Sequence, residues 1–403
     1  MAGFKYPIPT QQYIHGQFVN AKGRERATLR LTIDDSVVVQ DLYYANAEDI
    51  EIAVESVEKA PSLIERNDGK SGYMGCRRET NTVFEPKTAD LFRYLAGFYD
   101  KFSGECLSNN KGFLRIVRNE PLGICAAINA FNSSLLTFAM KAAPPRRRQP
   151  IEAGVPPSVL NILGGAAEAS VALSSHVKIR KISFTVVGKK VQVAATNSNL
   201  KRVTLELGGK SPVFVFEDAR LDEAVGESSR FLAFNGQGCV LGIRIYGADP
   251  FEMSTMSSPL FHSRQKEMVM RFLEKGKKEV EVVTGGNSWG SSGYFVEPTI
   301  FFKPVEGAEI VRKEVFGPVV VVDTFKTEEE VLKKANSTEY GLGASICTRD
   351  LNHAVRLRGS WKQGLWLLTM RCHFIPSHHL GVLRRIGSGI GQENGKYVLR
   401  EYC

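Results

Sequence analysis

One segment, from Val203 to Gly242, constrains the fold of this chain more than any other. It begins with a run of β-forming residues that predicts a strand ending at Glu206, and the apolar run PVFVF after a Gly-Gly turn predicts a second strand. Asp218 is placed to cap a helix with apolar spacing, and that helix gives way to a glycine-rich loop carrying Cys239. Strand-helix units of this kind return the chain to the same edge of a sheet, so the segment predicts an α/β fold.

The pairing of this carboxylate with this cysteine indicates chemistry. A lone cysteine among small residues is usually buried and inert. Here the run ELGGKSP begins at Glu206, and the run FNGQGC ends at Cys239. Together they resemble the two signatures of the aldehyde dehydrogenase superfamily, although the second run is one residue short. The resemblance implies that Glu206 is the general base, that Cys239 is the nucleophile, and that Gly208 is a cofactor-binding residue.

Two further runs support the same resemblance. The segment PLGICAAINAFN ends at Asn132, and its counterpart in the family supplies an amide to the oxyanion hole; the alternative is a turn or helix-cap asparagine. Ala130 and Ser134 stand where the family usually has prolines. In KEVFGPV, the resemblance implies that Glu314 holds the nicotinamide ribose and that Phe316 packs near the nicotinamide. A bare Lys-Glu pair would by default be a solvated surface pair.

Composition excludes several other classes of protein. The chain has 403 residues, 43% of them hydrophobic and 24% charged, which indicates a soluble globular protein of two or three domains. Its net charge of +9 comes with no aromatic interleaving or nucleic-acid-binding motif, so we expect no nucleic-acid partner. No apolar run is long enough to span a membrane, and no signal peptide is recognisable. Seven scattered cysteines suit a reducing compartment, so we expect a cytoplasmic protein.

The residue patterns also locate secondary structure. They predict strands over 13–19, 113–117, 181–185, 203–206 and 212–216, a strand leading into a turn over 121–132, and helices over 46–60, 88–102, 135–143, 221–231 and 262–278.

The resemblance implies an α/β architecture with three parts. A dinucleotide-binding domain is expected over 1–102 and 121–206, and a catalytic domain over 207–395. An oligomerisation element is expected over 103–120 and 396–403, the latter ending in a short strand. The expected assembly is therefore a homo-oligomer, a dimer or a tetramer.

The resemblance is interrupted where the cofactor would bind. The family's KPSE run, which holds the adenosine ribose, has no counterpart near 144–151, and Thr185 runs into Val186 and Val187 without the Gly-Ser turn that accepts the pyrophosphate. Further abrupt changes occur at 246–247 and 367–386. The resemblance thus implies NAD or NADP as cofactor, with a binding site that is incomplete.

A metal site is not expected. One histidine-rich stretch contains four candidate ligands, but their spacing fits no standard zinc pattern. These residues are Cys372, His373, His378 and His379.

The sequence therefore predicts an oxidoreductase that converts a small-molecule aldehyde to a carboxylic acid with NAD(P)+ through a cysteine thioester. A thiolate suits this reaction because it is a good nucleophile and a good leaving group. Two alternatives stay open: an impaired family member acting as a pseudoenzyme, an assembly subunit or an esterase only, and a faulty gene model of an active enzyme.

Overall fold

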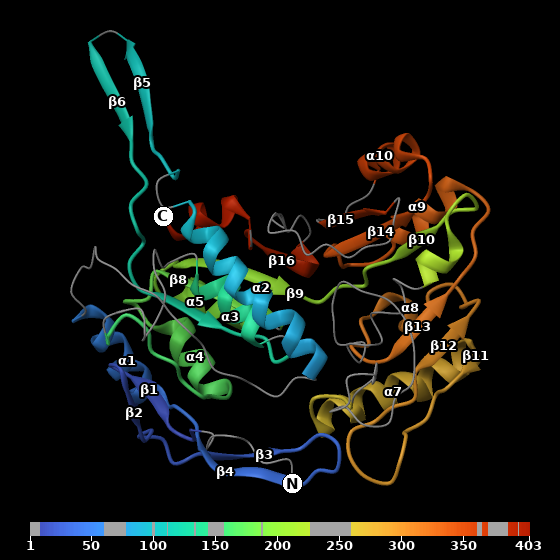
Figure 1. Ribbon diagram of the computed structural model, residues 1–403, viewed down its shortest axis with the longest axis horizontal. Helices are drawn as coiled ribbons and strands as arrows, with labels where there is room; N and C mark the ends of the chain where they lie inside the picture. The colour runs from blue at the N-terminus through green and yellow to red at the C-terminus, as the bar shows by residue number, and fades with distance from the viewer. Residues whose placement is uncertain are drawn as a thin grey trace.

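The computed structural model (Figure 1) describes residues 9–59, 78–98, 101–110, 112–132, 134–143, 157–186, 188–225, 259–360, 365–369, 386–393 and 395–403. Two lobes lie side by side, and an extended segment joins β9 of the first to β10 of the second (Figure 1).

The first lobe is built on a four-stranded sheet. Strands β7 (Cys125–Ile128), β8 (Lys181–Val186) and β9 (Arg202–Leu207) are parallel neighbours, and the short β16 (Gly389–Ile390) pairs antiparallel with β9. Parallel pairing requires crossover connections, which here include α4 (Ala167–Ser175) between β7 and β8 and α5 (Lys189–Ser198) between β8 and β9. This arrangement confirms the predicted α/β fold.

Alternation along the strands gives this sheet two different faces. Ile182 of β8 and Leu205 of β9 pack against Val191 and Ala195 of α5 and form an apolar layer. The opposite face carries the intervening polar residues of the same strands. It is covered by α2 (Arg78–Ala96), α3 (Ser134–Ala142) and the C-terminal 3-10 helix η3 (Lys396–Tyr402).

The second lobe contains two three-stranded sheets. In one, β10 (Val213–Val215), β14 (Gly343–Cys347) and β15 (Leu365–Thr369) are parallel and pack against α9 (Glu328–Asn336) and α10 (Leu351–Gly359). In the other, β11 (Glu281–Thr284), β12 (Thr299–Phe302) and β13 (Val319–Val322) pack against α7 (Ser263–Glu279) and α8 (Glu309–Arg312). The hydrophobic core between this β11–β12–β13 sheet and its helices includes Phe301 and Leu273, both fully buried.

Helix α1 (Ala47–Glu58) is close to its predicted range and shows why it begins where it does. The Asn46 side chain accepts a hydrogen bond from the Asp49 backbone N–H at 3.1 Å, and the Asp49 carboxylate accepts one from the Asn46 N–H at 3.0 Å. This reciprocal capping box satisfies two N–H groups that the helix itself leaves unpaired. Helices α3 and α7 likewise match their predicted ranges within about one residue.

Two predicted elements have different bounds in the structure. The single strand predicted over 13–19 is a hairpin, β1 (Gln12–Ile14) and β2 (Gln17–Val19), because His15 and Gly16 adopt positive φ angles of 52° and 77° and form a tight turn. The prediction of a helix over 88–102 was wrong at both ends. Helix α2 runs from Arg78 to Ala96 and stops at Gly97, whose N–H donates to the Arg93 carbonyl at 3.0 Å.

Two local roles were also predicted wrongly. Asp218 does not cap the following helix; its carboxylate accepts hydrogen bonds from Thr348 Oγ1 and the Arg349 N–H, both at 2.7 Å. The terminal segment is not a strand but the 3-10 helix η3, because Val398 and Tyr402 lie on one side and are buried against α2 and α3. Of the helix predicted over 221–231, residues 221–225 are helical and the rest lie outside the described residues.

A contact between distant segments ties the N-terminal region to the second lobe. The hairpin of β3 (Arg26–Arg30) and β4 (Val37–Tyr43) places its turn against Tyr294, whose N–H donates to Thr32 at 2.9 Å and whose hydroxyl donates to Asp35. Gly293 has φ 72°, and a Cβ there would overlap the Ile33 carbonyl oxygen. Only glycine allows this approach.

We expect Gly293→Ala to lower the free energy of unfolding by about 2–4 kcal/mol, because it adds backbone overlap to the strain of a left-handed alanine. Gly290→Ala is the matched control: Gly290 has φ 73° but no heavy atom closer than 3.8 Å to the added Cβ, so only the strain of about 1–2 kcal/mol applies. Urea unfolding of both variants measures the difference. Equal losses would show that the contact with Ile33 does not stabilise the fold.

Candidate active site

Two of the three predicted catalytic residues lie at the carboxyl edge of the first sheet. Asn132 follows β7 by four residues, and Glu206 is the penultimate residue of β9. Because β7, β8 and β9 are parallel, both positions belong to the same edge, where open α/β sheets bind their ligands. The structure thus brings together two segments that are far apart in the sequence.

Glu206 lies on the polar face of the sheet. Its neighbour Leu205 points into the α5 layer, so alternation turns Glu206 to the other side, with Thr204. It pairs with Thr185 on β8 and with Gly389 on β16. The strand is therefore held on both sides at the proposed general base.

Glu314 packs against the glycine turn that follows β9. The Gly209 N–H donates a hydrogen bond to Glu314 Oε1 at 3.2 Å. A Cβ on Gly208 would overlap Glu314 Oε2 and would come within 3.2 Å of the Tyr340 ring. The absence of a side chain at Gly208 therefore makes the space that the Glu314 carboxylate occupies.

Ser388 fixes the position of this turn. It is fully buried, donates to the Gly208 carbonyl at 2.7 Å and accepts from the Gly341 N–H at 2.8 Å. One hydroxyl therefore joins the end of β9 to the loop before β14. No sequence pattern predicted this role for Ser388.

Burial changes the charge behaviour of this cluster. Burial raises the pKa of Glu314 to about 7, and the Gly209 hydrogen bond and the nearby Lys210 charge oppose that shift. Burial lowers the pKa of Lys210 to about 8, opposed by Glu314. Both groups consequently change charge within about a unit of neutral pH, whereas their exposed counterparts do not.

Phe316 adopts a conformation that is uncommon outside glycine. Its φ is 54°, in the left-handed region. The Gln265 side-chain amide donates to its carbonyl oxygen at 2.7 Å, and its ring meets Phe131 edge-on with centroids 5.9 Å apart. Phe131 directly precedes Asn132, so the predicted nicotinamide side and the predicted oxyanion side of the site are in contact.

A buried ion pair lies under the polar face and was not predicted. Lys141 on α3 contacts Glu393 at 2.5 Å, and the Ser183 hydroxyl of β8 donates to the same carboxylate oxygen at 2.6 Å. Lys141 is 1% exposed and Glu393 9% exposed. The available signal was a lysine within the apolar spacing of helix α3, a position where a charged residue needs a buried partner.

Some predicted residues cannot be placed. Cys239 lies in 226–250, outside the described residues, as do the four candidate metal ligands in 370–385. Among the residues that the structure does describe, no group of three potential ligands is arranged to hold a metal ion. Likewise, no helix in the described part of the chain is long and apolar enough to cross a membrane.

The turn after β8 is partly as predicted. No Gly-Ser pair is present, but Gly188 directly precedes α5, and a Cβ on it would come within 2.8 Å of the Leu205 and Leu207 side chains. The strand-turn-helix frame of a pyrophosphate site is therefore present, while the side chains at its entrance differ from the family pattern.

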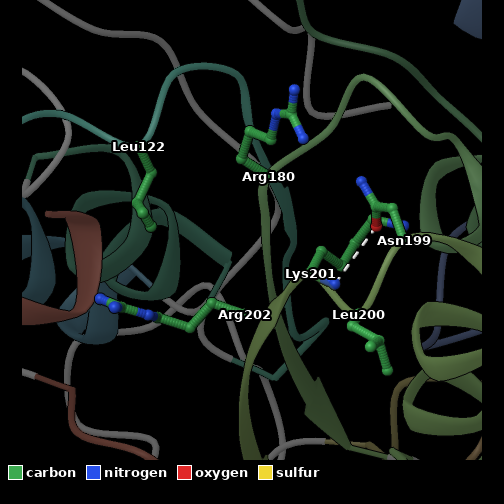
Figure 2. Close-up of a pocket in the computed structure, with 6 residues that line it drawn as sticks. All are labelled: Leu122, Arg180, Asn199, Leu200, Lys201 and Arg202. Atoms are coloured by element: carbon green, nitrogen blue, oxygen red, sulfur yellow. Dashed lines mark hydrogen bonds between the residues drawn. The ribbon is translucent and has the colours of Figure 1, made fainter.

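A surface hollow of about 420 Å³ lies at the opposite edge of the sheet (Figure 2), lined by Leu122, Arg180, Asn199, Leu200, Lys201 and Arg202. Figure 2 shows Arg180 and Arg202 extending in different directions. Lys201 already donates to the Ser174 carbonyl and the Ser198 hydroxyl, both at 2.6 Å. Because these cations do not converge, the hollow lacks the form of an anion site.

Comparison with known proteins gives a consistent result. The model of the aldehyde dehydrogenase family matches residues 58–145, 150–248 and 244–403. An aldehyde dehydrogenase of Davidiella tassiana is 33% identical over 477 aligned positions, covering 99% of this chain and 94% of the relative. Human retinal dehydrogenase 2 is 36% identical over 401 positions, covering 86% of this chain and 77% of the relative.

Solved structures agree with the sequence comparisons. The crystal structure of PnpE from Pseudomonas sp. WBC-3 has a TM-score of 0.89 and 26% identity, covering 98% of this chain and 96% of that one. An NAD+ complex of aldehyde dehydrogenase from Bacillus cereus has a TM-score of 0.82 and 27% identity, covering 97% and 94%.

The fold and these comparisons define an oxidoreductase of the NAD(P)-dependent class. The chain belongs to the aldehyde dehydrogenase family, whose reaction is the oxidation of aldehydes. NAD complexes among its structural neighbours show that dinucleotide binding is a property of this family.

The Glu314 environment gives a test based on pH. Its pKa is raised from 4.5 to about 7 in the folded protein, so the folded state binds this proton more tightly than the unfolded state. The stability it contributes is complete below about pH 4.5 and is lost as the pH rises through 7, on the order of 3 kcal/mol in total. Glu314→Gln removes this dependence. We therefore expect the variant to gain stability relative to the unmodified chain between pH 4.5 and 8, measured by urea unfolding at each pH.

The control for this measurement is Glu309→Gln. Glu309 is paired with Lys275 at 2.5 Å, and that hydrogen bond lowers its pKa. A lowered pKa affects stability only below about pH 4.5, so the difference in stability between Glu309→Gln and the unmodified chain should stay constant between pH 4.5 and 8. A pH-independent difference for Glu314→Gln would contradict a protonated buried carboxyl at this position.

Proposed function

We propose that this chain oxidises an aldehyde to a carboxylic acid through a thioester on Cys239. The observation that carries the proposal is the meeting of Asn132, Glu206 and the Gly208–Glu314 contact at one edge of the first sheet. Asn132 would donate its amide to the oxyanion, and Glu206 would act as the general base. The aldehyde dehydrogenase signatures around Glu206 and Cys239 support these roles.

The reaction follows from the chemistry of these groups. The Cys239 thiolate adds to the carbonyl carbon, and the Asn132 amide stabilises the negative charge that develops on oxygen. A bound nicotinamide supplies the acceptor for the hydride that leaves this carbon. Glu206 then takes a proton from water, which attacks the resulting thioester; the carbon–sulfur bond breaks, and the acid and the Cys239 thiol are released.

The nicotinamide half of the cofactor fits residues that the structure describes. Gly208 leaves the space beside Glu314, and Phe316 lies two residues further along the same loop. These residues would hold the ribose and the ring. The adenosine half is proposed to be held weakly, since the KPSE run and the Gly-Ser turn are absent.

Activity assays separate the two halves of this proposal. We expect Cys239→Ala to abolish ester hydrolysis and Asn132→Ala to lower its kcat by about 100- to 1,000-fold, as loss of one oxyanion donor does. Cys106→Ala is the control, because Cys106 is an exposed thiol on β5. Unchanged hydrolysis in Cys239→Ala would refute the assignment of the nucleophile.

The same preparation tests the cofactor site. Loss of two or three charge-assisted hydrogen bonds costs about 3–9 kcal/mol, so NAD should bind at least about a hundredfold more weakly than an intact site allows. Aldehyde oxidation should therefore saturate only at high NAD concentration. Full turnover at micromolar NAD would show that the altered segments rebuild the site.

A projecting hairpin supports the proposed homo-oligomer. Strands β5 (Glu105–Asn110) and β6 (Phe113–Val117) extend away from both lobes (Figure 1). Leu114 is 67% exposed and Ile116 60% exposed, on the same face of β6. An isolated two-stranded hairpin has marginal stability in water, and exposed apolar residues favour association. We therefore propose that a second subunit packs against this hairpin.

We also propose the division into domains that the family resemblance implies. The dinucleotide-binding domain would comprise 1–102 and 121–206, the catalytic domain 207–395, and the oligomerisation element 103–120 and 396–403. The protein would be cytoplasmic, with no membrane or nucleic-acid partner.

Light scattering tests the assembly. The unmodified chain should be a dimer or larger at micromolar concentration, and the double variant Leu114→Glu/Ile116→Glu should be a monomer, because charges on the ribbon oppose burial. Val305→Glu is the control, since Val305 is 58% exposed elsewhere on the surface. A monomer before any substitution would refute the proposed oligomer.

A further inference from the structure

Three aromatic rings connect the two sides of the candidate active site. Phe261, two residues before α7, stacks on Phe131 with ring centroids 4.6 Å apart and an interplanar angle of 28°. Phe131 in turn meets Phe316 edge-on at 5.9 Å and 84°. Both separations lie within the range in which aromatic pairs stabilise one another beyond simple burial.

Phe261 directly precedes the N-cap residue of α7, so the start of this helix fixes its position. The His262 side chain caps this helix by accepting from the Arg264 N–H at 3.1 Å. Gln265, in the same turn, donates to the Phe316 carbonyl and so holds the left-handed conformation of that residue. One helix start therefore contacts both Phe131 and Phe316.

The loop that carries Asn132 needs such support. Ala130 and Ser134 occupy positions on either side of Asn132 where the family has proline, so no proline ring restricts the backbone there. Phe131 is the residue next to Asn132, and its ring is held between Phe261 and Phe316. An amide that donates to an oxyanion must be placed within a fraction of an ångström, and packing against a rigid element supplies that placement.

We propose that Phe261 is a positioning residue: its ring, stacked on Phe131, holds the Asn132 amide in place for the reaction. This inference rests on the proposed function of Asn132. Phe261 is itself 44% exposed, so the position is not one where the core alone demands a large side chain.

The test uses ester hydrolysis by the full chain, which needs no added cofactor. Phe261→Leu should lower kcat by about 2- to 10-fold, the effect of one aromatic pair, with little change in KM. Phe261→Tyr retains the ring and should keep full activity. Phe131→Leu also removes the contact with Phe316, so it should lose at least as much as Phe261→Leu. The double variant should lose no more than Phe131→Leu alone, because the contact with Phe261 is already absent there.

The matched control is Phe18→Leu. Phe18 is 55% exposed, and its ring pairs with Tyr13 at a centroid distance of 5.3 Å in the β1–β2 hairpin. The substitution therefore removes a similar aromatic contact in a segment that carries none of the candidate site residues. It should leave kcat unchanged.

The decisive measurement repeats Phe261→Leu in the Asn132→Ala background. If Phe261 acts through Asn132, its substitution has no further effect there. The same fold-loss in both backgrounds would overturn the inference, as would unchanged hydrolysis in Phe261→Leu alongside a large loss in Asn132→Ala. Unchanged hydrolysis in Asn132→Ala would instead refute the proposed function of Asn132 itself, and the inference with it.

Discussion

The buried ion pair between Lys141 and Glu393 is the contact on which the first lobe depends most. It joins α3 to the C-terminal segment, and the Ser183 hydroxyl connects both to the middle of the sheet. Removing one partner would leave an uncompensated charge in the interior, which costs about 3–5 kcal/mol in comparable cases. Since α3 begins two residues after Asn132 and Glu393 follows β16, this pair connects the segment after Asn132 to the segment after the strand that pairs with Glu206.

The two-faced sheet explains how an apolar core and a polar site share the same strands. On β8 and β9 the residues facing α5 are apolar, and the residues between them include Lys181, Ser183, Thr204 and Glu206. Lys181 donates to Thr204 at 2.5 Å and lies 4.6 Å from the Tyr402 ring, and burial lowers its pKa to about 8. Lys181 and Thr204 are thus paired with each other, as are Lys141 and Ser183 with Glu393 Oε1, which makes the burial of these groups tolerable.

Local patterns predicted most of the elements, but not their tertiary partners. The α/β fold, helix α7 and strand β8 follow from apolar periodicity, which is a property of neighbouring residues. The hairpin at His15, the role of Asp218 and the 3-10 form of η3 could not be predicted in this way, because each is decided by a residue elsewhere or by a turn conformation. In the site, motifs identified Glu206, Gly208 and Glu314. Ser388 and Lys141 were missed because their importance lies in contacts across more than 40 residues of sequence.

The turn after β9 has a structural role that does not depend on any cofactor. Gly208 and Glu314 are also structural: the turn after β9 is held by Ser388 from one segment and by Glu314 from another, and it is the link between the two lobes. A side chain at Gly208 would displace Glu314 and disturb that link. Loss of the Gly208–Glu314 contact would therefore also loosen the connection between the two lobes.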